Sequence, residues 1–170
     1  MSLSGTSQAT AIAAGVAGLT REFIREQVGV SSPSSALVKA AMINGARDLG
    51  TPDIPNAAEG WGEVDLERTV LPMDGSTPLD TFVDDKKVLS PGFGLLYSFS
   101  IDPSYGLDMT LAWTDEAGSA IAPQSQARLV NNLDLVLVGP DGTEWLGNDF
   151  AQGFTTVSYT HLRAHETYDH

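Results

Sequence analysis

A serine in the first turn of an expected helix is the residue of this chain best suited to chemistry. Ser7 follows Gly5 and Thr6, and apolar residues then recur at helical spacing from Ala9 to Ile24. The free N–H groups and the positive dipole end of such a helix favour an oxyanion forming beside the serine. Ser and Thr at helix starts more often act as plain N-caps, so the motif alone leaves both roles open. The helix carries little charge before its last turns, so we expect most of it to be buried.

The residues around this serine extend into a longer signature. Residues 5–15, GTSQATAIAAG, resemble the serine-site motif of subtilisin-like serine proteases (subtilases, peptidase family S8), G-T-S-x-A-x-P-x-x-A-G. Gln8 and Ala11 stand where the family usually has methionine and proline, and both are good helix formers. Two further segments follow in the family's order. Residues 34–46, SSALVKAAMINGA, resemble P-x-x-L-K-x-A-[LM]-I-x-[GT]-A, and residues 60–65, GWGEVD, resemble G-x-G-x-V-[DN].

The resemblance implies that Ser7 is the nucleophile of a serine-type endopeptidase, which cleaves proteins or peptides by acyl transfer through a Ser-His-Asp triad. In subtilases the triad aspartate and histidine and the oxyanion-hole asparagine precede the serine, so all three would lie before Met1. We therefore expect the chain to hold only the nucleophile and its backbone donor, and to be inactive alone. The resemblance also implies a secreted protein, although no signal peptide opens the chain.

A second helix is predicted after Val30. Ser32 is expected to be its N-cap, with Pro33 at the first helical position, and Gly45 or Gly50 to end it. In the GWGEVD segment, the tryptophan is expected to be a packing residue and the glycines to be turn residues.

Residues 73–157 have strand periodicity. Half-buried strands are predicted at 95–101 and 109–114, and a less regular one at 133–138. The run GPDG at 139–142 predicts a hairpin that leads to a strand at 143–147. Short strands of this kind favour an antiparallel β-sandwich or jelly roll. Residues 112–115, 129–135 and 147–150 resemble the jelly-roll domain appended to KP-43-like subtilases.

These patterns predict that the chain has three parts. A turn-rich linker at 72–78 separates the first part from the second. Residues 1–72 would be the C-terminal part of a subtilisin-like α/β catalytic domain, including two of its helices. Residues 73–157 would be a truncated antiparallel β-sandwich, and residues 158–170 a non-native tail.

The tail contains all three histidines of the chain, and His161 and His165 have the i, i+4 spacing of helical metal ligands. A catalytic base there would contradict the family's order. Residues 159–167, YTHLRAHET, also resemble a translated sequencing adapter. We therefore expect a frayed, exposed terminus without a stable partner.

The predicted chemistry requires no cofactor, and structural calcium is left open because calcium ions stabilise the KP-43-like proteins. Strand-end Asp and Asn more often serve turns than metals, and no loop has EF-hand spacing, so the ligands stay uncommitted. The candidate oxygen ligands are Asp115, Asn132, Asp134, Asn148 and Asp149.

Composition limits the partners. Nine basic and 22 acidic residues give a net charge of -13, which argues against nucleic acid and anionic membranes. No run of eighteen apolar residues is present, so no membrane span is expected. The chain has no cysteine and hence no disulfide framework.

Two other functions compete with the protease. A free-standing, non-catalytic β-sandwich binding module with a helical extension would account for residues 73–157 but not for residues 1–72. A lipase-like serine hydrolase would need a G-x-S-x-G elbow, of which residues 5–9 supply only the first half.

Overall fold

The N-terminal helix forms where alanines and other helix formers follow one another without a proline. α1 spans Thr6–Phe23 and continues as a π-helix, η1, at Ile24–Val28. It ends at Gly29, whose left-handed φ of 84° suits glycine. These elements belong to a computed structural model that describes residues 5–50, 55–74, 77–102, 104, 106–118, 121, 129–147 and 160–168. The predicted helix and the place of the serine in its first turn are confirmed.

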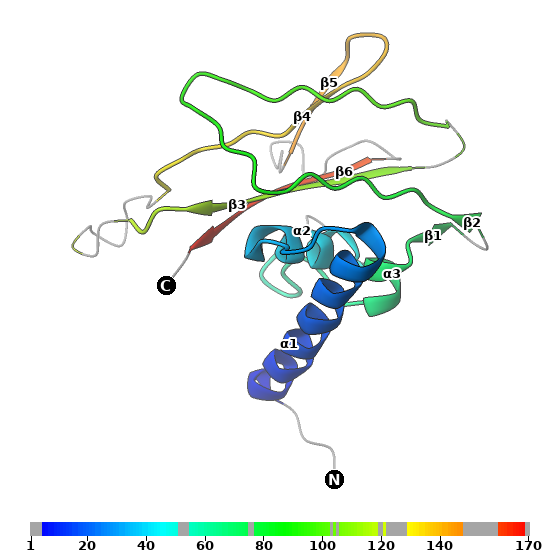
Figure 1. The fold of residues 1–170 in the computed structure, drawn as a ribbon, viewed down its shortest axis with the longest axis vertical. Helices are drawn as coiled ribbons and strands as arrows, with labels where there is room; N and C mark the ends of the chain where they lie inside the picture. Colours follow the sequence, from blue (N-terminus) through cyan, green and yellow to red (C-terminus); the bar gives the residue numbers. More distant parts are fainter. Residues whose placement is uncertain are drawn as a thin grey trace.

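The predicted burial of this helix is wrong. Ile12 and Leu19 expose 62% and 50% of their surface, and Thr20 is the buried residue of α1. The N-terminal half of the helix projects away from the other elements, and the C-terminal half meets α2 and α3 (Figure 1). Apolar side chains are buried only where a partner surface covers them, and the described residues cover only one half of α1.

The second helix, α2, spans Ser35–Asn44 and is capped by Ser34, whose Oγ accepts a hydrogen bond of 3.0 Å from the amide of Leu37. The prediction of Ser32 as the cap is therefore wrong by two residues. Gly45 ends the helix, as predicted. A Cβ on Gly45 would lie 2.6 Å from the Cα of Thr69, so only glycine lets α2 and α3 approach so closely.

The helical part (residues 5–72) ends with a short helix, and before it two loop segments are joined by backbone hydrogen bonds. α3 spans Leu66–Val70, and Asp65 caps it by accepting a bond of 3.0 Å from the amide of Arg68. Arg47 and Glu63 exchange two backbone hydrogen bonds of 2.8 Å, and Gly62 beside them has a φ of 108°. The predicted turn role of this glycine is confirmed. Four apolar residues are buried in the described part: Ile24, Leu37, Ile43 and Ala46.

The later residues form three two-stranded sheets in the described part of the chain. β1 (Met73–Asp74) pairs with β2 (Thr77–Pro78), and β4 (Val136–Val138) pairs with β5 (Glu144–Leu146), both antiparallel. The β4–β5 pair confirms the predicted hairpin. β3 (Leu107–Asp115) confirms the strand predicted at 109–114 and packs on α2. Two sheets packed face to face are not seen among these strands, so the antiparallel sandwich stays a prediction.

Two predictions about strands are wrong. Residues 95–101 form no strand, and Leu96 is 93% exposed. Residues 160–168, expected to be frayed, form β6 (Thr160–Tyr168), which runs parallel to β3 from Leu107↔Thr160 to Asp115↔Tyr168. The unpaired edge of β3 offers a row of backbone groups to which any extended segment can bond, whatever its composition. The non-native origin of 158–170 and the three-part division stay predictions.

None of the helices in the described ranges has the length and apolar character that crossing a bilayer requires.

Candidate active site

Ser7 is the second residue of α1 and its side chain is exposed. Gly5 is the N-cap, and its carbonyl accepts bonds of 3.2 and 3.3 Å from the amides of Gln8 and Ala9. No side-chain hydrogen bond caps this helix, so Ser7 does not act as an N-cap. The capping alternative for the motif is therefore wrong. The hydroxyl of Ser7 is left available at the exposed start of the helix.

The same turn provides hydrogen-bond donors. The amides of Thr6 and Ser7 precede the first intrahelical bond and have no carbonyl partner within the helix. The first turn carries no acidic residue that would offset the positive end of the helix dipole. An oxyanion beside the Ser7 hydroxyl would meet both the dipole and the free N–H groups. This is the arrangement that nucleophilic acyl transfer needs on the serine side.

The structure does not bring a base to this serine among the side chains that it describes. His161 and His165 lie on β6, which pairs with β3 and contacts α2 (Figure 1), and His170 is outside the described residues. Four residues span about 13 Å on a strand, so the i, i+4 spacing does not place these two histidines side by side as it would on a helix.

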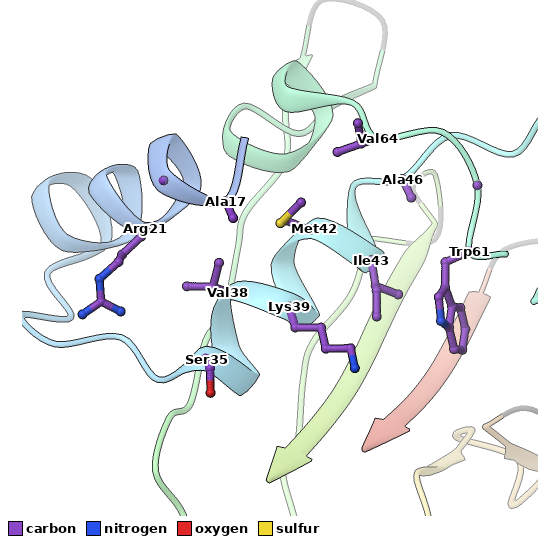
Figure 2. Close-up of a pocket in the computed structure, with 12 residues that line it drawn as sticks. Ala17, Arg21, Ser35, Val38, Lys39, Met42, Ile43, Ala46, Trp61 and Val64 are labelled. Atoms are coloured by element: carbon purple, nitrogen blue, oxygen red, sulfur yellow. The ribbon is translucent and has the colours of Figure 1, made fainter. Parts of the chain in front are cut away.

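An apolar cleft of about 590 Å³ lies between α1, α2 and the loop before α3. Figure 2 shows Val38, Met42 and Ile43 from α2 facing this space, with Ala17 of α1 on one side and Trp61 on the other. Ala17 lies ten residues after Ser7, about 15 Å along the helix axis. The cleft thus lies within the helical part, remote from Ser7. Trp61 lines it, in keeping with the predicted packing role.

Asp115, a candidate calcium ligand, is committed to a loop. It is only 4% exposed, and its carboxylate accepts bonds of 2.8 Å from the amide of Val130 and 2.6 Å from Nδ2 of Asn131. The amides of Asn131 and Glu116 donate further bonds of 3.1 and 3.0 Å. Burial acts to raise the pKa of Asp115, but these hydrogen bonds outweigh it and hold the pKa below its ordinary value.

Both carboxylate oxygens of Asp115 accept N–H groups, so in the structure this residue fastens a loop, and structural calcium stays a prediction. Asn132 and Asp134 are exposed, and Asn148 and Asp149 lie outside the described residues. Across the described ranges, no three His, Cys, Asp or Glu side chains gather as metal ligands would.

Residues 1–62 match the model of the Subtilase family. The matched range includes Ser7, α2 and the loop of Gly62. The chain is also similar to the serine protease/ABC transporter B family protein tagA of Dictyostelium discoideum, at 33% identity over 151 residues. That similarity covers 81% of this chain but only 8% of the relative's length. No solved structure matches the chain significantly.

The two matches support a relationship of this chain to the subtilases, a family of serine proteases. Residues 1–62 are about a third of the chain, so a similarity that covers 81% of it must continue into the residues from 73 onward, which contain the strands and are called the β part. The helices and small antiparallel sheets are consistent with part of a subtilisin-like α/β fold.

Proposed function

We propose that this chain carries the nucleophile-bearing part of a serine endopeptidase, with Ser7 as the catalytic serine. The carrying observation is the position of Ser7 in the exposed first turn of α1, where it is not used as a cap. The match of residues 1–62 to the Subtilase family supports the same role. The substrates would be proteins or peptides, and secretion of the protein is part of the same proposal.

The proposed reaction needs partners for Ser7. A histidine accepts the hydroxyl proton while Oγ forms a bond to the scissile carbonyl carbon, and a buried aspartate orients that histidine. The resulting oxyanion is bound by the first-turn amide of Ser7 together with an asparagine side chain. The tetrahedral intermediate then expels the amine, which takes the proton from the histidine, and water hydrolyses the acyl-enzyme by the same route. The chemistry requires no metal or cofactor.

We propose that the histidine, the aspartate and the asparagine come from polypeptide outside these 170 residues. The positions of the described histidines on β6 support this view. The chain alone would then be inactive, because removing the base forfeits most of the catalysis.

A fluorophosphonate probe tests the proposal. We expect the probe to form an adduct on Ser7 in the full-length protein that contains this chain, and to leave the isolated 170 residues unlabelled. Ser7→Ala should abolish labelling, whereas Ser31→Ala, at another exposed serine before α2, should leave it unchanged. An intact, folded full-length protein without an adduct would favour the non-catalytic binding module instead.

A further inference from the structure

An extended segment after β2 folds back on itself. Phe82 lies with its ring centroid 5.6 Å from that of Tyr97 and 5.3 Å from that of Phe99. The hydroxyl of Tyr97 donates a bond of 2.6 Å to Asp84, which also pairs with Lys87 at 3.3 Å. The bond from Tyr97 is the main reason that the pKa of Asp84 lies below its ordinary value. These contacts give residues 82–87 a defined shape although they form no helix or strand.

The same residues contact the N-terminus of α2. Asp85 accepts bonds of 2.9 Å from the amide of Ser34 and 2.5 Å from its hydroxyl. The Ser34 hydroxyl in turn accepts the bond from the amide of Leu37, so the carboxylate adds a second layer to the helix cap. Lys86 donates a bond of 2.6 Å to the carbonyl of Ser32. Two adjacent residues therefore bind both sides of Pro33.

The backbone of Lys86 has an unfavourable conformation in this contact. Its φ is 59°, the left-handed value found for no other non-glycine residue in the described ranges. A side chain is disfavoured there because its Cβ comes too close to the following carbonyl oxygen. The carboxylate of Asp85 also accepts a bond of 2.9 Å from the amide of Lys86, which helps to hold the turn. A strained turn of this kind persists where the surrounding contacts determine it.

The charge of Asp85 also fits its position. The first turn of α2 contains no acidic residue, so the helix itself provides nothing to offset the positive end of its dipole. Asp85 provides that charge from 51 residues further along the chain. At the other end of α2, Thr110 of β3 donates a bond of 2.8 Å to Oδ1 of Asn44. The later residues are thus attached to both ends of α2.

We propose that residues 82–87 form a latch, which fastens the β part to α2 through Asp85 and makes the helical and β parts one cooperative unit. α2 is then the junction of the molecule, because it packs on α1 on one side and on β3 on the other (Figure 1). The inference is independent of any role for Ser7. It also means that the turn-rich linker at 72–78 does not separate two independently moving parts.

Amide hydrogen exchange of the 170-residue chain tests the latch. Asp85→Ala removes the second cap, and Asp80→Ala is the matched control because Asp80 is an exposed carboxylate on the same segment. We expect exchange at the amides of Ser34 and Leu37 to become about tenfold or more faster in Asp85→Ala, since hydrogen bonds to charged groups contribute most. Exchange in the control should stay as in the parent chain. Equal exchange at Ser34 in the two variants would overturn the proposal.

A cross-linking measurement keeps the test decisive even if Asp85→Ala loosens the whole chain. The sequence has no cysteine, so two introduced cysteines can pair only with each other within one chain. We expect Ser34→Cys with Asp85→Cys to form an intramolecular disulfide on oxidation, visible by non-reducing electrophoresis. Ser34→Cys with Asp80→Cys should not. Equal trapping in both pairs would show that the segment has no fixed place on α2.

Discussion

Alanine at position 62 should destabilise the chain far more than alanine at position 60. Both glycines have a positive φ, 61° at Gly60 and 108° at Gly62. A Cβ on Gly60 would meet nothing within 4 Å, whereas a Cβ on Gly62 would lie 2.5 Å from the carbonyl oxygen of Arg47 and 2.9 Å from its carbon. That carbonyl accepts the amide of Glu63, so it cannot move away without losing the bridge between the two segments.

The magnitudes follow from these geometries. A left-handed backbone costs a side chain about 1 kcal/mol, and this is all that Gly60→Ala should lose. At Gly62 the unfavourable φ adds to a clash with fixed backbone, and together they should cost about 3 kcal/mol. For a chain of this size the midpoint of thermal unfolding should fall by about 6–12 °C in Gly62→Ala and about 2–4 °C in Gly60→Ala.

Thermal unfolding followed by far-ultraviolet circular dichroism measures both variants against the parent chain. Urea unfolding checks that the slope with denaturant is unchanged, so that the shift reports stability. If Gly62→Ala proves as mild as Gly60→Ala, the close approach of Arg47 does not constrain this loop and the reasoning is refuted.

Two further predictions concern buried polar groups. The hydroxyl of Thr20 is fully buried without a hydrogen-bond partner, so Thr20→Val should stabilise the chain by about 1 kcal/mol in urea unfolding; an unchanged midpoint would mean that the hydroxyl is satisfied. The lowered pKa of Asp115 means that its stabilising contribution is present above its ordinary pKa of 3.8 and is lost as pH falls through the lower folded value. The stability difference between the parent chain and Asp115→Asn should therefore shrink below about pH 4, and a constant difference down to pH 2 would contradict this account.

The parts of the fold that depend on neighbouring residues were predictable from the sequence. The helix that carries Ser7, the end of α2 at Gly45 and the β4–β5 hairpin all follow from local spacing and turn chemistry. The position of Ser7 in the first turn was predicted for the same reason. Its freedom from capping was not, because Ser and Thr are ordinary caps and only the structure shows that Gly5 takes that place.

The parts that depend on distant contacts were not predictable. Ser32 and Ser34 are locally equivalent caps on either side of Pro33, and Asp85 stabilises Ser34 from far along the chain. The alternating pattern at 95–101 predicts a strand, but a strand forms only where a partner strand pairs with it. Here Tyr97 and Phe99 pack on Phe82 instead.

Whether Asp115 binds calcium or holds a loop by hydrogen bonds was likewise open in the sequence. A carboxylate at the end of a strand suits either role, because its two oxygens can coordinate calcium or accept hydrogen bonds from loop amides. The hydrogen-bond partners of Asp115 in the structure, Val130 and Asn131, lie 15 and 16 residues away in the chain. No local pattern in the sequence specifies that contact.

The attachment of α2 at both ends sets an order of events during synthesis. The contacts of Ser34 with Asp85 and of Asn44 with Thr110 span 51 and 66 residues. At a translation rate of about 5–20 residues per second, α2 waits about 2–8 s after its own synthesis before Asp85 has been made. Within residues 1–62 alone, α2 therefore lacks the contacts that Asp85 and Thr110 make at its two ends.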